Sequence, residues 1–483
     1  MIASLRSSML LHQRAAIAAP SVRPILQRGA LRSLATHAAG PITWTAAPES
    51  KPATLHLKSG HSFTGRSFGA PRSVFGETVF TTSITSYTES LTDPSYQGQI
   101  LTFTQPLMGN YGVPDNGCGQ SPIEHPDDVD VGAFLESNKV QAAGVIVSNL
   151  AERFSHYLAK ESLATWCARH NVPGIFGVDT RAITSLLRDQ GSTLGAILVG
   201  DGHQSSPAVA DYIDPMADNL IAKVSTKQPY VLHPVGGAQA ARCHVALMDF
   251  GCKANILRSL LRRGASVTVL PWDYDFNKVR DGFDGLFLSN GPGSPYSIQP
   301  ALDMARAAIA EWDRPIFGIC MGNQVIGIAA GVEAYRMKFG NRGHNQPVVA
   351  LKSAGNFVKR GRVYITSQNH GYALTPDETK WPEGWQPWFV NANDSSVEGI
   401  IRTQLNEKRA MVWGVQFHPE HAGGPEDTNG IFQDFVEEVV RIKRHQGRSH
   451  AGNGLPEHVK VQEGAPAFPV NDFGVVGQIP AHL

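Results

Sequence analysis

The sequence lacks several features that would assign a function class at once. It contains no run of about 18 apolar residues that could span a bilayer and no G-x-x-x-x-G-K-[ST] pattern that could cradle the phosphates of ATP. Neither sign of charge is in excess, because 42 Lys plus Arg stand against 42 Asp plus Glu. We therefore expect no membrane span, no nucleic-acid partner and no cofactor in this chain, and a protein or a small molecule as its partner.

Cysteine is scarce as well. The five cysteines are odd in number, widely spaced and without a C-x-x-C pair, which excludes a disulfide framework and a structural zinc site. His418 and His421 stand three residues apart with no third ligand nearby, so we expect no metal there either. An ordinary cysteine is a small buried apolar residue, and a reactive role has to follow from its context.

The first 48 residues contain no Asp or Glu. They do contain five arginines, namely Arg6, Arg14, Arg23, Arg28 and Arg32. Arg-rich, acid-free N-termini of this kind are typical of mitochondrial import signals. We interpret residues 1–40 as a presequence, cleaved between Arg28 and Gly40, and expect the mature protein in the mitochondrial matrix. A disordered basic tail on a cytoplasmic protein is the alternative.

Residues 50–228 are predicted to form an N-terminal domain of mixed α/β structure. Apolar residues at helical spacing indicate a helix over 158–170, and the Pro- and Gly-rich stretch 225–241 is typical of a linker. Short alternating runs between turns of Gly and Pro predict strands, at 53–57, 62–69 and 78–85.

Residues 242–443 show strands alternating with helices, at 254–263 and 300–312 among others. This alternation predicts an α/β domain with a doubly wound parallel sheet. A last helix is expected over 430–443, and residues 444–483, which have no sustained periodicity, are expected to form a flexible tail. Ligands of such sheets bind beyond the carboxyl ends of the strands.

The strongest local signal is a buried strand that leads directly into Gly318-x-Cys320-x-Gly322 and then a helix. This is a nucleophile elbow with cysteine in place of serine, in which the glycines permit the sharp turn. The amino end of the following helix favours the thiolate. We therefore predict that Cys320 is a catalytic nucleophile.

A later strand, 410–417, carries His418-Pro-Glu420 at its carboxyl end. A catalytic cysteine needs an imidazole to move its proton, and the imidazole needs a carboxylate that fixes its tautomer. We assign these roles to His418 and Glu420. The N–H of Met321 and the loop 290–293 are candidate donors for a tetrahedral oxyanion.

With Cys, His and Glu in this order, residues 245–440 resemble the class I glutamine amidotransferases. The resemblance implies glutamine hydrolysis through a thioester, with ammonia passed to an associated synthetase. One position departs from the family pattern, because Asn323 stands where the family commonly has histidine.

The N-terminal domain narrows the resemblance. The segments 76–99 and 177–184, together with 251–258 and 367–372, resemble the small subunit of carbamoyl-phosphate synthetase over about residues 53–440. This implies that ammonia passes through a tunnel into a large partner subunit, which binds bicarbonate and ATP. It also implies that eight residues surround the substrate L-glutamine: Ser95, Gly291, Gly293, Met321, Gln324, Asn369, Gly371 and Tyr372.

A separate small subunit with an apparent presequence is similar to the arginine-specific fungal form, whereas the pyrimidine-pathway form is typically one fused cytosolic polypeptide. Three alternatives remain open at this point. The chain could be the glutaminase of another synthetase, such as one making anthranilate or guanylate. It could be a non-catalytic regulatory paralogue, or a cysteine hydrolase that acts alone on peptides.

Overall fold

The computed structural model describes residues 49–114, 134–402, 411–448 and 462–463 of the 483-residue chain. The predicted presequence, 1–40, and most of the predicted tail, 444–483, lie outside the described residues. Within the described ranges, each helix is too short or too polar to cross a membrane.

Seven strands of the N-terminal part close into a barrel in the order β1-β11-β3-β4-β7-β10-β2. The segment from β3 through β4 and β7 to β10 is parallel, and the other pairs are antiparallel. The strands are β1 Pro52–Leu57, β2 Ser62–Gly69, β3 Val74–Thr81, β4 Gln99–Phe103, β7 Gly144–Ile146, β10 Pro173–Phe176 and β11 Thr193–Val199.

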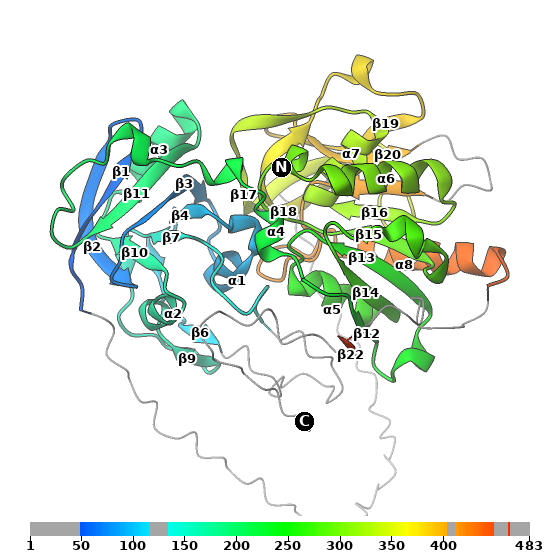
Figure 1. Ribbon diagram of the computed structural model, residues 1–483, viewed down its shortest axis with the longest axis horizontal. Helices are drawn as coiled ribbons and strands as arrows, with labels where there is room; N and C mark the ends of the chain where they lie inside the picture. The colour runs from blue at the N-terminus through cyan, green and yellow to red at the C-terminus, as the bar shows by residue number, and fades with distance from the viewer. Residues whose placement is uncertain (1–48, 115–133, 403–410, 449–461, 464–483) are drawn as a thin grey trace, which may run out of the picture. The chain divides into compact units, whose positions relative to one another are not determined.

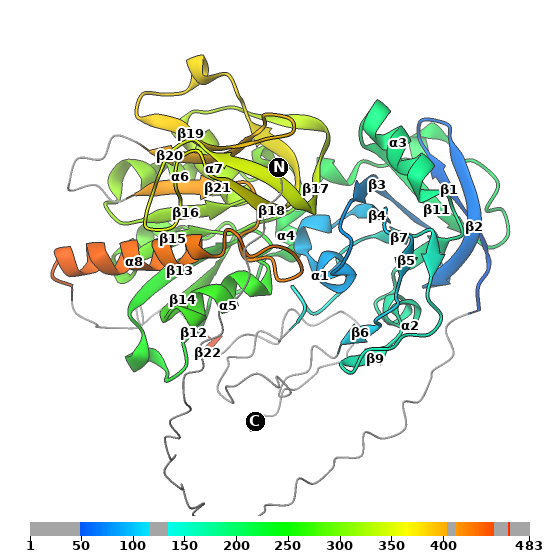
Figure 2. The same cartoon turned by 180° about the vertical axis from the view of Figure 1, so that it is seen from behind.

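Helices and short strands surround this barrel (Figures 1 and 2). The helices are α1 Tyr87–Thr92, α2 Leu163–Arg169 and α3 Thr180–Gln190, whereas α4 Ile221–Val224 packs through Ile221 on a core of the C-terminal part. The short strands form two pairs, β5 Leu107–Met108 with β8 Asn149–Leu150 and β6 Val113–Pro114 with β9 Ala159–Glu161.

The prediction of a helix over 158–170 was wrong at its start. The Ser162 side chain accepts a hydrogen bond from the Thr165 N–H at 3.1 Å, so it caps a helix that begins only at Leu163. The preceding residues Ala159–Glu161 pair with β6 instead. The helical spacing of apolar residues continued through Ala159–Glu161, so the sequence did not show where the helix begins.

The C-terminal part is built on an eleven-stranded sheet in the order β18-β17-β19-β20-β21-β16-β15-β13-β14-β12-β22. Its strands are β12 Tyr230–Leu232, β13 Cys243–Asp249, β14 Ala265–Pro271, β15 Gly285–Leu288, β16 Ile316–Ile319, β17 Ala334–Ala350, β18 Val363–Leu374, β19 Trp385–Asn391, β20 Val397–Arg402, β21 Val412–Val415 and β22 Gln462–Glu463. The run from β21 to β14 is parallel, as predicted, and antiparallel strands are added on both sides.

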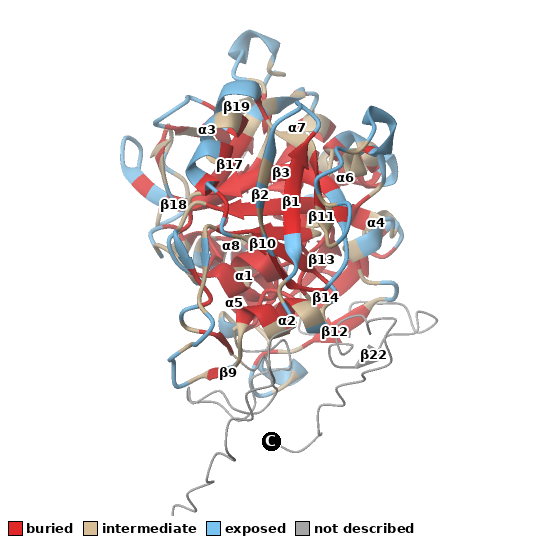
Figure 3. Ribbon diagram, turned by 90° about the vertical axis from the view of Figure 1, so that its left-hand side faces the viewer, coloured by how far each residue is buried: buried red, intermediate tan, exposed pale blue. Residues whose placement is uncertain are grey.

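Helices cover both faces of this sheet, which confirms the doubly wound arrangement (Figures 1 and 2). The helices α5 Ala254–Arg262 and α8 Gly430–His445 pack on one face, and α6 Gln299–Glu311 and α7 Met321–Ala330 on the other. Alternate residues of the same strand supply the two cores, because Val245 and Leu247 of β13 belong to one and Ala246 and Met248 to the other. Buried residues gather on the strands accordingly (Figure 3).

Two further expectations need correction. The predicted linker 225–241 contains β12, which pairs with β14 and so belongs to the sheet. The predicted tail begins too early, because α8 continues to His445 and the described residues Gln462–Glu463 pair with β12. Short strands of two or three residues carry too little periodicity to be recognised in a sequence.

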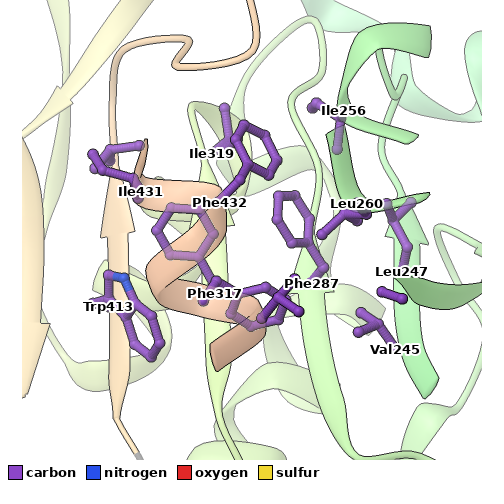
Figure 4. Packing of buried hydrophobic residues seen from close by; sticks show 14 of the residues in the cluster. Val245, Leu247, Ile256, Leu260, Phe287, Phe317, Ile319, Trp413, Ile431 and Phe432 are labelled. Atoms are coloured by element: carbon purple, nitrogen blue, oxygen red, sulfur yellow. The ribbon is translucent and has the colours of Figure 1, made fainter. Parts of the chain in front are cut away.

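Phe287 lies at the centre of the core beneath α5 and α8 (Figure 4). Its ring centroid is 5.4 Å from that of Phe317, 5.9 Å from that of Phe432 and 5.5 Å from that of Phe435. These aromatic contacts join β15 to β16 and to α8. The same strands end at the residues predicted to do chemistry.

We expect Phe287→Ala to lower the free energy of unfolding by about 3–5 kcal/mol, because a fully buried ring leaves a cavity. Urea denaturation of the purified chain measures this. The control is Tyr157→Ala, at a side chain that is 86% exposed, which should change the free energy by no more than about 0.5 kcal/mol. Equal effects of both substitutions would contradict this view of the core.

Candidate active site

Cys320 stands in a strained turn between β16 and α7. Its φ of 53° and ψ of −101° are unusual for a residue other than glycine. A Cβ at Gly318 would lie 2.4 Å from the carbonyl carbon of Gly322, and one at Gly322 would lie 2.1 Å from the Leu288 oxygen. Both glycines are therefore required by close approach of backbone, as the nucleophile-elbow motif predicts.

His418 and Glu420 follow β21, the strand that pairs in parallel with β16. Nδ1 of His418 lies 2.7 Å from Oε1 of Glu420, and both side chains are buried. Among the described residues, Nε2 of His418 makes no well-aligned hydrogen bond, and the Cys320 side chain lies near enough to affect its protonation. The structure thus brings the three predicted catalytic residues together at neighbouring strand ends.

The electrostatics of this group favour a charged imidazole. Burial and the cation of Lys253 oppose charge on His418, but the carboxylate of Glu420, the hydrogen bond to it and the proximity of Cys320 raise the pKa of His418 to about 10. Burial also opposes charge on Glu420, yet the cations of Lys253 and His418 hold its pKa down at about 2. A protonated His418 beside Cys320 is the partner that a thiolate requires.

Lys253 was missed by sequence reasoning, although it stands in the segment 251–258 that carried the resemblance. Its ammonium is buried, 3.0 Å from Oε1 of Glu420 and 3.7 Å from Oε1 of Glu136. Burial opposes its charge, but the two carboxylates raise the pKa of Lys253 above its usual value. Glu136 is fixed in turn by the backbone N–H of Asn255, 3.1 Å from its Oε2. A second ionic layer therefore lies behind the catalytic carboxylate.

A pocket opens beside Cys320. All eight residues expected to surround glutamine line it together with Cys320: Ser95, Gly291, Gly293, Met321, Gln324, Asn369, Gly371 and Tyr372. The described residues that line it do not include His418 or Glu420. Sequence reasoning missed further polar lining residues, among them Glu77, Gln99, Arg336 and Arg342.

Ser95 is held in the pocket by hydrogen bonds to Asn290 and Asp93. Its hydroxyl accepts a hydrogen bond from Asn290 Nδ2 at 3.0 Å, and its N–H donates to Asp93 at 2.9 Å. Asp93 also accepts from Asn369 Nδ2 at 2.9 Å. Asn290 in turn accepts the backbone N–H of Lys253 at 3.0 Å. One network of hydrogen bonds therefore connects the predicted substrate residues to the ionic layer.

Known proteins resemble this chain in both parts. Residues 246–438 match the model of the class-I glutamine amidotransferases, and residues 55–197 match that of the carbamoyl-phosphate synthase small chain, CPSase domain. The chain is 46% identical over 415 residues to the carbamoyl phosphate synthase arginine-specific small chain of Aspergillus niger, and the alignment covers 86% of each chain. This chain belongs to the carbamoyl-phosphate synthase small chain family.

A second relative, the arginine-specific small chain of Phaeosphaeria nodorum, is 43% identical over 437 residues, which cover 88% of this chain and 86% of that one. Among solved structures, a glutamine amidotransferase from Thermotoga maritima covers 43% of this chain and 87% of its own, at 14% identity and a TM-score of 0.30.

Asn323, the departure from the amidotransferase pattern, lies away from the pocket. It is buried, and its Nδ2 donates to Gln416 Oε1 at 3.3 Å. The same oxygen accepts from Gln324 Nε2 at 3.2 Å, and Gln324 also donates to the Tyr372 carbonyl at 3.1 Å. Within the described part of the chain, hydrogen bonds therefore connect the Asn323 side chain to the substrate pocket through Gln416 and Gln324.

We expect Lys253→Met to lower the free energy of unfolding by about 3–5 kcal/mol at neutral pH, because two buried carboxylates lose their cation. The pKa of Glu420 is depressed from 4.5 to about 2. Its stabilising contribution is therefore present above about pH 4.5 and lost as the pH falls toward 2. The difference between variant and wild type should shrink over that interval. Urea denaturation at several pH values measures it.

Lys278→Met is the matched control. Lys278 is exposed and pairs with Asp275 at 3.2 Å, so its loss should cost less than about 1 kcal/mol. If Lys253→Met is no more destabilising than this control, the ionic layer does not stabilise the fold.

Proposed function

We propose that this chain is the glutaminase subunit of a carbamoyl-phosphate synthase, hydrolysing L-glutamine and delivering the ammonia to a large subunit. The observation that carries the proposal is the group Cys320, His418 and Glu420 beside a pocket lined by every residue expected to hold glutamine. The family membership of the whole chain supports the same activity.

The reaction proceeds in two halves on Cys320. The sulfur attacks the side-chain amide carbon of glutamine while His418 holds the thiol proton and passes it to the leaving nitrogen. The C–N bond breaks, ammonia departs and a thioester remains. Water then attacks the thioester as His418 accepts its proton and returns it to the sulfur, which releases glutamate.

Each neighbour has a role in this cycle. Glu420 fixes the tautomer of His418 through Nδ1 and stabilises its cation. The N–H of Met321, at the start of α7, is our candidate donor to the oxyanion, together with the backbone around Gly291. The retained catalytic group argues against a non-catalytic paralogue.

The relatives are named as arginine-specific small chains of carbamoyl phosphate synthase. We propose the same pathway for this chain, and a large partner subunit, in a heterodimer or a higher assembly, that binds bicarbonate and ATP. Ammonia passes between the subunits through a tunnel. The absence of a P-loop pattern from the sequence is consistent with this division of labour.

The assay measures glutamate release and carbamoyl phosphate formation by the chain assembled with a large carbamoyl-phosphate synthase subunit. Cys320→Ser should reduce glutamine-dependent synthesis by at least about 10⁴-fold, because the nucleophile is lost. Synthesis from added ammonium should continue at the wild-type rate. If wild type and variant are equally inert with glutamine while ammonium supports synthesis, the glutaminase proposal fails.

Localisation follows from the acid-free N-terminus. We propose import into the mitochondrial matrix, supported by the arginines at 6, 14, 23, 28 and 32. The full chain with a fluorescent C-terminal tag should colocalise with mitochondria in a fungal cell. Replacing all five arginines with Gln should leave it in the cytoplasm. Equal distributions of the two forms would contradict the presequence interpretation.

A further inference from the structure

Arg342 is a buried cation in the neighbourhood of Cys320. It lies on β17, and only 5% of its surface is exposed. Among the residues that the structure describes, its guanidinium donates one hydrogen bond, from Nη1 to the Phe339 carbonyl, and its Nε has no partner. Across the described ranges it forms no ion pair with a carboxylate. Because burying an unpaired charge is costly, this position calls for an anion.

The guanidinium faces the pocket beside Cys320. Arg342 lines that pocket and pairs across the sheet with Asn369 on β18. A Cβ placed on Gly371 would lie 3.4 Å from Nη2 of Arg342. The free end of the guanidinium is therefore adjacent to Gly371, one of the residues expected to hold glutamine.

The neighbouring acids are already engaged. Glu77 binds Arg336 through Oε1 at 2.7 Å and Gln99 through Oε2 at 2.7 Å. Asp93 accepts from the Ser95 N–H and from Asn369, as described above. An ionised Tyr96 would also favour the Arg342 charge. Burial raises the pKa of Tyr96, however, so its phenol stays neutral. The described protein groups thus leave the positive charge of Arg342 available to a ligand.

We propose that Arg342 binds the α-carboxylate of L-glutamine and so determines the specificity of this pocket for free amino acid. This inference rests on the proposed glutaminase function. A carboxylate matches the planar donors of a guanidinium, and the substrate brings this one into the pocket that Arg342 lines. Within the protein, the carboxylate of Glu77 has the largest favourable effect on the Arg342 charge, but it forms no ion pair with this guanidinium and is already paired with Arg336.

The test compares two substrates on the assembled enzyme, L-glutamine and L-glutamine α-amide, whose α-carboxylate is replaced by a neutral amide. Arg342→Met should lower kcat/KM for L-glutamine by about 30- to 100-fold, mainly through KM, because a charge-assisted contact is lost. For the α-amide the change should be within about threefold. Arg342→Lys should restore part of the discrimination.

Arg336→Lys is the matched control, because Arg336 also lines the pocket and a lysine there keeps a cation beside Glu77, so that Glu77 is not released as a counter-ion for Arg342. It should preserve the preference for L-glutamine over the α-amide. Ammonium-dependent carbamoyl phosphate synthesis at the wild-type rate shows that each variant folds and assembles.

A loss that is equal for both substrates overturns the proposal. An unchanged preference between the two substrates, accompanied by a shift in the pH dependence of Cys320 alkylation, also overturns the proposal. That result would show that Arg342 acts on the sulfur of Cys320 and not on the substrate. Calorimetric titration of L-glutamine into Cys320→Ser, with and without Arg342→Met, separates this inference from the proposed function. Binding that depends on Arg342 in a wild-type protein that hydrolyses no glutamine would sustain the inference and end the glutaminase proposal.

Discussion

The site depends on one buried cation, the ammonium of Lys253. It lies between Glu420, which orients the catalytic imidazole, and Glu136, which belongs to the N-terminal part of the chain. The ammonium is retained by the two carboxylates and each carboxylate by the ammonium, whereas the two carboxylates repel each other. The backbone N–H of Lys253 also donates to Asn290, and Asn290 donates to the hydroxyl of Ser95. The position of Lys253 therefore influences the geometry of the substrate pocket.

The second constraint is the parallel sheet. β15, β16 and β21 are adjacent and run in the same direction, so the loops that follow them meet at one edge. Each loop supplies one component, namely Gly291, Cys320 and His418. The aromatic core around Phe287 holds these strands against α8 and thereby fixes the spacing of the loops. Packing on one face of the sheet therefore determines geometry at its end.

Much of this could be predicted because it is encoded locally. Cys320 lies between the two glycines of a nucleophile elbow, and His418 precedes Glu420 by two residues. These short motifs were sufficient to predict the three catalytic residues. The pairing of Lys253 with Glu136 joins residues far apart in the sequence and leaves no local pattern. The same holds for Arg342, because its lack of an ion pair with any described carboxylate is visible only once its neighbours are placed. Strand β12 was not predicted, because a strand of three residues is too short to show an alternating pattern of apolar residues.

Two buried basic side chains differ in their counter-ions, and this difference separates a structural role from a role in substrate binding. Lys253 has two carboxylates from its own chain and lies behind the catalytic group, where its charge is neutralised before any substrate arrives. Arg342 has one carbonyl partner among the described residues and lines the pocket, where its charge is not neutralised until an anion enters. Supplying a counter-ion to Arg342 from the protein would stabilise the empty pocket and weaken its attraction for a carboxylate. The cost of the unpaired guanidinium is therefore the source of its affinity for substrate.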